Sequence, residues 1–346
     1  MKKLKVASLF SGGGGTDIGF VGGFDFLGKH YSDNEVEIVY ANDIETSANT
    51  MFEKYFGITP DSRNVREVLS SDIPSFDILT GGFPCQSFSV SAQNPKRLGI
   101  KDEKGTLFFE MVRILKDHQP KAFFAENVKG ILSANKKEAF PLIIEEFEKA
   151  GYRISYKICV ATKYGVPQKR ERVFIVGIRK DLGFTFEFPD DPIENPSEFI
   201  PLKTILQQDI EEKYYFSERA VQGMLNSKSG KKMNKGRAQD IEQPSNTVSS
   251  HLAKVSLNST DPVLLEDGRY RRYTPREVAR IQSFPENYEL IGSESSQYKM
   301  LGNAIPPVMM WHVATKLLSD LRNHEEVSSQ QHQKNKLGQI DLFDFL

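Results

Sequence analysis

The sequence predicts an α/β protein with a doubly wound, mainly parallel sheet and a second, smaller domain. Short apolar runs alternate with amphipathic stretches along the first half of the chain, which is the rhythm of βαβ units. This rhythm stops at residues 188–192, a stretch rich in proline and aspartate that we interpret as a linker. Residues 190–280 are then polar, rich in turn-forming residues and without long periodic helices.

Six apolar runs are the candidate strands of the sheet. They are Leu4–Phe10, Glu37–Ala41, Phe76–Thr80, Ala122–Ala125, Ile154–Val160 and Val173–Ile178. Apolar residues at helical spacing predict one helix that is capped by Thr106 and includes Leu115. A second helix is predicted over Glu138–Ala150, ending at Gly151. Beyond the small domain, Pro307–Leu321 predicts a further amphipathic helix.

These patterns divide the chain into four parts. Residues 1–189 form the large domain, residues 190–280 the small one, and residues 281–322 return to the large domain. The tail, residues 323–346, is rich in Gln, Ser, His and Lys. We expect this tail to be disordered, although it ends in an apolar segment.

Composition excludes several classes of protein. Hydrophobic residues make up 39% and charged residues 26% of the 346 residues, an ordinary mix for a folded globular chain. Apolar runs fall short of the ~20 residues of a membrane span, and the start of the chain does not resemble a secretory signal, so a cytoplasmic protein is expected. Two cysteines and six scattered histidines predict neither a disulfide scaffold nor a metal site.

A formal net charge of −1 hides a local imbalance. The stretch from Arg219 to Arg276 holds eleven basic and five acidic residues, whereas Asp181 to Glu218 holds two basic and ten acidic ones. A basic segment in a neutral protein favours a surface that faces a polyanion, because phosphate contacts need cations. On charge alone, a solvated loop region is the alternative.

Two features near the start of the chain predict a ligand site at the carboxyl edge of the sheet. Gly12–Gly15 follow the first strand and precede a helix, so backbone amides can approach a ligand closely. Asp43 ends the second strand, where an acid can accept both hydroxyl groups of a ribose. The glycines match neither G-x-G-x-x-G nor a P-loop, so the pair favours S-adenosylmethionine over NAD. A plain tight turn is the alternative for the glycines.

Three further groups are predicted at the same edge. Cys85 lies in a Pro-Cys-Gln loop directly after a strand, whereas Cys159 lies in an apolar strand and is interpreted as core. Glu126 ends the next strand, and Arg170 and Arg172 precede another. A thiol, a carboxyl group and arginines together suit nucleophilic and acid–base chemistry. Taken singly, each has a plain alternative as a core thiol, a solvated acid or a solvated charge run.

Together these features resemble the C5-cytosine DNA methyltransferases of bacterial restriction-modification systems. Six motifs of that family occur in order over nearly the whole chain. They are Leu9-Phe10-Ser11-Gly12, Gly82-Phe83-Pro84-Cys85-Gln86, Glu126-Asn127-Val128, Gln168-Lys169-Arg170-Glu171-Arg172, Arg272-Tyr273-Thr274-Pro275-Arg276-Glu277 and Gly302-Asn303-Ala304-Ile305-Pro306-Pro307.

The resemblance implies the fold and reaction of that family. The fold is that of S-adenosylmethionine-dependent methyltransferases, and the activity is that of a sequence-specific DNA (cytosine-5-)-methyltransferase that flips a cytosine out of the duplex. Cys85 would add to C6, Glu126 would protonate or hydrogen-bond N3, and S-adenosylmethionine would methylate C5. Arg170 and Arg172 would complete the catalytic set, Arg172 by contacting the base or its phosphate.

The candidate cofactor-binding residues lie in several of these motifs and between them. They are Phe10, Ser11, Gly12, Gly14, Asp43, Ile44, Asn64, Pro84, Leu107 and Asn303. The chain departs from the family's pattern in its four consecutive glycines, in Asn64 where an aspartate often contacts the adenine, and in Ile44 where some members have an aromatic residue.

The small domain would be the target-recognition domain, and the polar loop Gln86–Gly99 would close over the flipped base. The candidate DNA-binding residues are Gln86, Ser89, Lys96, Arg97, Arg237, Thr247, His251 and Lys254. Arginine pairs with guanine and lysine more often meets phosphate. Which base each residue reads does not follow from the sequence.

Two other functions stay open at this stage, a tRNA cytosine-5 methyltransferase and a non-catalytic DNA-binding protein on the same scaffold. The expected partners are double-stranded DNA, a separately acting restriction endonuclease and a bacterial sliding clamp. The clamp would bind Gln339–Phe343, which is similar to the Gln-x-x-Leu-Phe peptide that docks on it. The alternative is that this apolar tail packs on the large domain. We expect a monomer in the bacterial cytoplasm, associated with the nucleoid.

Overall fold

The computed structural model describes residues 3–84, 106–226, 238–252 and 261–343. Within them the central sheet has six strands in the order β4-β1-β5-β6-β8-β7. The strands are β1 (Leu4–Leu9), β4 (Val36–Asn42), β5 (Ile78–Gly81), β6 (Ala122–Val128), β7 (Tyr152–Val160) and β8 (Glu171–Arg179). β8 is antiparallel to both neighbours and the other pairs are parallel. The predicted α/β class with a mainly parallel sheet is confirmed.

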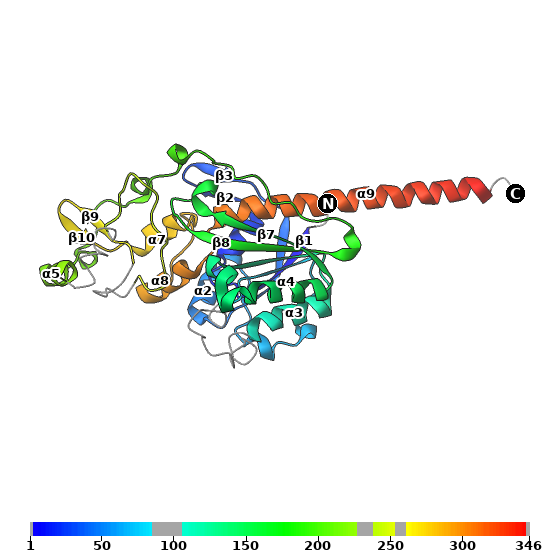
Figure 1. Ribbon diagram of the computed structural model, residues 1–346, viewed down its shortest axis with the longest axis horizontal. Helices are drawn as coiled ribbons and strands as arrows, with labels where there is room; N and C mark the ends of the chain where they lie inside the picture. The colour runs from blue at the N-terminus through cyan, green and yellow to red at the C-terminus, as the bar shows by residue number, and fades with distance from the viewer. Residues whose placement is uncertain (1–2, 85–105, 227–237, 253–260, 344–346) are drawn as a thin grey trace.

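Helices cover both faces of the sheet because its strands are apolar on both sides. Phe123 of β6 packs in the cluster that includes α3 (Thr106–His118) and α4 (Ala139–Lys149). Phe124, the next residue, packs in the opposite cluster with α1 (Gly15–Val21) and α9 (Pro307–Phe343). Figure 1 shows α3 and α4 below the sheet and α9 above it.

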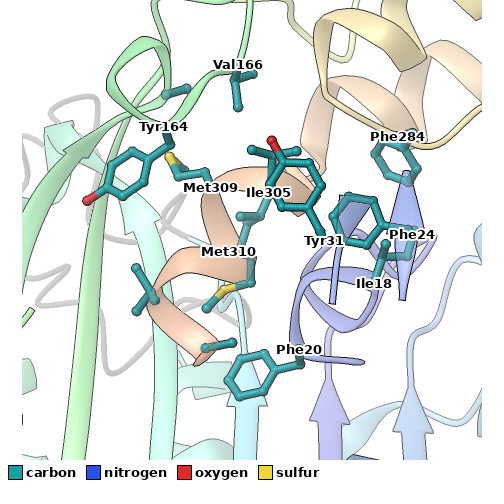
Figure 2. Packing of buried hydrophobic residues seen from close by; sticks show 14 of the residues in the cluster. Ile18, Phe20, Phe24, Tyr31, Tyr164, Val166, Phe284, Ile305, Met309 and Met310 are labelled. Carbon is teal, nitrogen blue, oxygen red and sulfur yellow. The ribbon is translucent and has the colours of Figure 1, made fainter. Parts of the chain in front are cut away.

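The C-terminal part of the chain packs onto the N-terminal part. Figure 2 groups Met309 and Met310 of α9 with Phe20 of α1 and with Tyr164, which lies just before β8. A Cβ atom on Gly19 would lie 2.5 Å from the Cβ of Met310, so a glycine lets α1 and α9 approach closely. The start of α9 is therefore part of the main core.

Smaller elements complete the described fold. Three further helices are α2 (Thr46–Phe56), α7 (Pro275–Ile281) and α8 (Glu294–Asn303), and α5 (Glu218–Asn226) lies at the far end of the molecule (Figure 1). Two hairpins are β2–β3 (Phe24–Phe26, Lys29–Tyr31) and β9–β10 (Leu264–Glu266, Arg269–Arg271). The 3₁₀ helices are Val65–Glu67, Ser70–Asp72, Lys129–Lys137, Ala161–Tyr164, Lys180–Leu182, Pro196–Glu198, Leu202–Ile205 and Glu212–Tyr214.

The backbone of the tail is helical as far as Phe343. α9 continues to Phe343, and its second half extends away from the rest of the molecule (Figure 1). Residues beyond 322 are mostly helix formers without proline, so they prolong a helix that tertiary packing has already nucleated. None of the described helices is both long and apolar enough to cross a membrane.

Candidate active site

A cavity of about 700 Å³ opens at the carboxyl edge of the parallel strands. It brings together residues from the glycine-rich loop, the ends of β4, β5 and β6, and the C-terminal segment. The predicted site residues that line it are Phe10, Ser11, Gly12, Asp43, Ile44, Asn64, Pro84, Leu107, Glu126, Arg170, Arg172 and Asn303. Residues predicted for cofactor binding and residues predicted for catalysis therefore line one cavity.

Gly14 does not line this cavity, contrary to its predicted role in cofactor binding. Its φ is +83° and it caps the N-terminus of α1, so it needs the left-handed conformation that glycine adopts easily. A Cβ atom there would lie 2.5 Å from the ring of Phe56. The residue faces α2, and its part is to shape the turn.

The neighbouring glycines are required by close packing against the C-terminal segment. A Cβ atom on Gly13 would lie 2.4 Å from the sulfur of Met300, and the hydroxyl of Tyr288 donates to the Gly13 carbonyl at 2.6 Å. A Cβ atom on Gly15 would lie 2.4 Å from the carbonyl oxygen of Ile305. The run of four glycines thus has a separate cause at each of these positions.

Asp43 is held in place by the backbone around it. Its Oδ2 accepts from the amide of Gly12 and its Oδ1 from the amide of Glu45, both at 2.8 Å. Burial raises the pKa of this carboxyl, while these two hydrogen bonds and the charge of Lys299 act in the opposite direction. Each carboxylate oxygen can accept a further hydrogen bond, and Asp43 lines the cavity, which suits a ligand with two adjacent hydroxyl groups.

Two residues that depart from the pattern of the resembled family, Ile44 and Asn64, line the cavity. Ile44 is 64% exposed, so an apolar surface is available at the rim. Asn64 caps the following 3₁₀ helix by accepting from the amide of Arg66 at 3.2 Å. Its remaining amide group is a hydrogen-bond donor, whereas an aspartate would offer an acceptor.

Glu126 and Arg172 form the charged pair at the other end of the cavity. Arg172 lies opposite Val128 in the β6–β8 register, which puts it diagonally across from Glu126. Its Nε lies 2.7 Å from Oε1 of Glu126, and the two side chains are 13% and 12% exposed. The second oxygen, Oε2, faces Gly82, where an added Cβ atom would lie 3.4 Å away.

The loop that leads to the predicted nucleophile is fixed beside this pair. Asn127 donates from its side chain to the carbonyl of Phe83 at 3.1 Å, and Pro84 lines the cavity. Cys85 itself lies outside the described residues. Cys159 is buried, as predicted, and burial raises the pKa of its thiol to about 11.

Comparison with known proteins identifies the family. The family model of C-5 cytosine-specific DNA methylase matches residues 4–319. The chain belongs to this family. It is therefore an enzyme, a DNA cytosine-C5 methyltransferase, and the resemblance seen in its motifs is confirmed.

Relatives and solved structures agree with this assignment. The chain is 36% identical to Type II methyltransferase M.FnuDI of Fusobacterium nucleatum, covering 99% of this chain and 100% of that one. It is 33% identical to Type II methyltransferase M.DsaV of Dactylococcopsis salina, covering 92% of this chain and 87% of that one. The Entamoeba histolytica methyltransferase EhMeth shares the fold with a TM-score of 0.73 at 19% identity, over 93% and 99%. A putative DNA modification methyltransferase of an E. coli prophage shares the fold with a TM-score of 0.69 at 19% sequence identity, covering 92% of this chain and 100% of that one.

Arg170, which is predicted to belong to the catalytic set of this methyltransferase, is buried and bonded to two backbone segments. Its side chain is 1% exposed and donates to the carbonyls of Val248 at 3.3 Å and Gly302 at 3.1 Å. Burial lowers the pKa of its guanidinium. Although it borders the cavity, its hydrogen bonds to Val248 and Gly302 hold two backbone segments together, which favours a positioning role.

The predicted DNA contacts are placed only in part. Thr247 donates to the carbonyl of Lys169 at 3.0 Å, and His251 is exposed beside Ser250. Both therefore lie in a segment that adjoins the catalytic motifs. Gln86, Ser89, Lys96, Arg97, Arg237 and Lys254 lie outside the described residues. Among the described residues no group of three or more His, Cys, Asp or Glu is arranged to hold a metal ion.

Sequence reasoning missed several residues that shape the site. Lys299 pairs with Glu45 at 2.7 Å on the cavity wall, and Tyr288 holds the glycine-rich loop. Gln168 and Gln282 are fully buried and bonded to each other. Their partners are distant in the sequence, and a pattern along the chain carries no signal for such contacts.

Proposed function

We propose that this methyltransferase flips a cytosine out of duplex DNA and methylates its C5 with S-adenosylmethionine as donor. The observation that carries the proposal is that one cavity joins the Gly12–Asp43 end to the Glu126–Arg172 pair. Pro84, the residue before Cys85, lines the same cavity. A nucleoside-bearing ligand and a cytosine could therefore meet there.

The residues at the first end fit S-adenosylmethionine. Asp43 would accept the ribose hydroxyls, Ile44 would cover the adenine, and Asn64 would bind its edge as a donor. Space above Gly12 is open, since no described atom lies within 4 Å of a Cβ built there. The hydroxyls of Ser11 and Thr80 line the cavity and have no hydrogen-bond partner among the described residues, so a ligand could satisfy them.

The chain's own residues would activate the cytosine. The thiolate of Cys85 would form a bond to C6, and the electron pair of the C5–C6 bond would move to C5 and toward N3. Oε2 of Glu126 would hold a proton at N3, while Arg172 fixes Oε1 and orients the carboxyl group. S-adenosylmethionine, when bound, supplies the electrophilic methyl group. A base would then remove the C5 proton as the Cys85 sulfur leaves.

Residues 190–280 would read the DNA sequence, as a target-recognition domain. Support comes from the basic stretch 219–276 and from the position of Thr247 and His251 next to the catalytic motifs. The relatives are named Type II methyltransferases, which favours a modification enzyme that acts as a monomer beside a separate restriction endonuclease in a bacterial cytoplasm. In the cell, the enzyme would be associated with the nucleoid.

Methylation assays with labelled S-adenosylmethionine test this function. We expect transfer to duplex DNA but not to bulk tRNA, and a covalent complex with DNA that carries 5-fluorocytosine. Cys85→Ser should keep DNA binding and lose both, since an alcohol is not ionised near neutral pH. Transfer to tRNA alone would favour the tRNA alternative, and DNA binding without transfer a non-catalytic protein. Mapping 5-methylcytosine in cells that express the enzyme gives the recognition sequence.

The tail would bind a sliding clamp through Gln339–Phe343. A terminal arm that extends from the molecule can present Leu342 and Phe343 to a hydrophobic pocket and raise the enzyme's local concentration on DNA. In the structure the backbone of these residues is helical. A pull-down on purified bacterial clamp should retain the full chain and release a chain that ends at Gly338. Equal retention of both would exclude this partner.

A further inference from the structure

Two fully buried glutamines, Gln168 and Gln282, connect the catalytic motifs with the region assigned to DNA reading. Nε2 of Gln168 donates to Oε1 of Gln282 at 2.7 Å, and both side chains are 0% exposed. We call this pair the glutamine bridge. Burying two side-chain amides costs free energy unless their polar atoms form hydrogen bonds. The surrounding residues therefore have to supply hydrogen-bond partners for both glutamines.

Further hydrogen bonds connect each glutamine to a different backbone segment. Oε1 of Gln168 accepts from the amide of Val248 at 2.9 Å. Nε2 of Gln282 donates to the carbonyls of Leu301 and Ala304, which flank Asn303 in sequence. The bridge therefore ties the segment 245–249 to the loop before α9.

Backbone contacts reinforce the same junction. The amide of Lys169 donates to the carbonyl of Ser245 at 2.8 Å, and the amide of Ser245 donates to the carbonyl of Pro167 at 2.9 Å. On the far side, a Cβ atom on Gly302 would lie 2.2 Å from the backbone of Ser249. Arg170 adds its bonds to Val248 and Gly302. Segment 245–249 is thus held between the β8 motif and the Asn303 loop.

We propose that Gln168 and Gln282 are positioning residues that fix segment 245–249 relative to Arg172 and Asn303, and that this fixed relation makes methylation depend on the DNA sequence. The inference rests on the proposed function, in which residues 190–280 read DNA. Thr247 and His251 would then contact the DNA bases, and the rigid junction would couple a correct fit there to the position of the catalytic pair. A loose junction would let a poorly matched DNA reach the catalytic pair.

The test compares methylation rates on two duplexes, the mapped recognition sequence and the same duplex with one base pair changed. The variants are Gln168→Met, Gln282→Met and Gln119→Met. Gln119 is the matched control, because its Nε2 also donates to backbone carbonyls, of Leu115 at 2.9 Å and Ala150 at 3.1 Å, away from the cavity. The ratio of the two rates does not change when part of the enzyme is unfolded, so a purely structural role would leave it unaltered.

We expect the ratio to fall about tenfold in the two bridge variants, which is the size of a single base-pair preference, and to stay at the wild-type value in the control. If a single variant fails to fold, the double variant Gln168→Met/Gln282→Met replaces two facing amides by two apolar chains of similar length, which costs less. A wild-type ratio in folded bridge variants would overturn the proposal. A wild-type enzyme that methylates neither duplex would instead overturn the proposed function.

Discussion

At the scale of single residues, the arrangement of Glu126 and Arg172 decides which carboxyl oxygen is available for chemistry. Arg172 contacts Oε1 at 2.7 Å, so Oε2 is the oxygen that can meet a base. Because both side chains are mostly buried, their hydrogen bonds and charges are little screened by water. A buried pair of this kind fixes the orientation of the carboxyl group.

Replacing Glu126 by Gln tests this assignment. The amide keeps the shape of the side chain but cannot transfer a proton, so methyl transfer in a single turnover should fall by about 10²–10⁴-fold. DNA and cofactor affinity should change little. The control is Glu145→Gln on α4, which removes an exposed carboxylate that pairs with Lys149. Single-turnover rates near wild type for Glu126→Gln would contradict the role.

Asp17 presents a different case, a buried acid without a compensating charge. It is 0% exposed, and neither of its carboxyl oxygens has a hydrogen-bond partner among the described residues. Burial raises its pKa from 3.8 to about 7, although the nearby Ser8 hydroxyl offsets part of this effect. The neutral acid is therefore the form that suits the fold.

The sign of the resulting pH dependence follows from linkage. A carboxyl whose folded pKa is raised favours folding below pH 4, and this contribution is lost as pH rises through about 7. The asparagine of Asp17→Asn is neutral at every pH, so this variant should not lose unfolding free energy through this group as pH rises. We expect the variant to gain up to about 4 kcal/mol of unfolding free energy at pH 8 relative to wild type, and little at pH 4. Urea unfolding at both pH values measures it, and an equal change at both would contradict the argument.

At the scale of elements, the strands were predicted well because burial on both faces of the central sheet requires continuous apolar runs. The predicted run Val173–Ile178 became β8, Glu171–Arg179, and Glu138–Ala150 became α4, Ala139–Lys149. Hairpins such as β2–β3 were missed, since strands of three residues carry too little pattern to detect. The helical backbone of the tail up to Phe343 was not predicted for a related reason: composition does not show that a packed helix continues into it.

The glycine-rich turn shows what a motif leaves out. From the sequence, its four glycines suggested approach to a ligand, yet Gly15 is constrained by the carbonyl of Ile305, a residue far along the chain. The motif does border the cavity. The reason for its unusual composition lay in tertiary packing.

Gly15→Ala tests the packing explanation. The added methyl group would lie 2.4 Å from a backbone oxygen, which cannot move aside as a flexible side chain can. Overpacking of this kind should destabilise the protein by about 1–3 kcal/mol and displace the loop that lines the cofactor end. Gly130→Ala is the control, because its Cβ atom would meet nothing closer than 3.8 Å. Similar melting temperatures for the two variants would contradict the explanation.

At the scale of the whole molecule, the hydrophobic core is not divided where the domain boundaries were predicted. Val248 and Leu264, from the region assigned to the small domain, belong to the same buried cluster as Phe174 of β8 and Met310 of α9. The same junction makes Arg170 a link between segments, which its position in a charge run could not reveal. The division into domains stays a prediction, but any division must cut through a continuous core.

Contacts between residues 321–325 of α9 and the rest of the molecule predict where the chain can be shortened. Glu325 pairs with Lys121, His324 stacks on Phe184 with ring centroids 4.3 Å apart, and Leu321 is 1% exposed. Beyond them the helix extends away from the molecule (Figure 1). A chain that ends at residue 326 should therefore melt within about 2 °C of the full chain and methylate DNA at the same rate.

A chain that ends at residue 320 should behave differently, because it loses the buried Leu321 together with both contacts. Removing a buried leucine alone costs about 2–5 kcal/mol, and each kcal/mol lowers the melting temperature by about 1–2 °C in a chain of this size. Thermal unfolding of the three chains in parallel measures the difference. Equal melting temperatures for the chains ending at 326 and at 320 would mean that the outer half of α9 stabilises the protein. The conclusion that this half of the helix makes no stabilising contact would then be wrong.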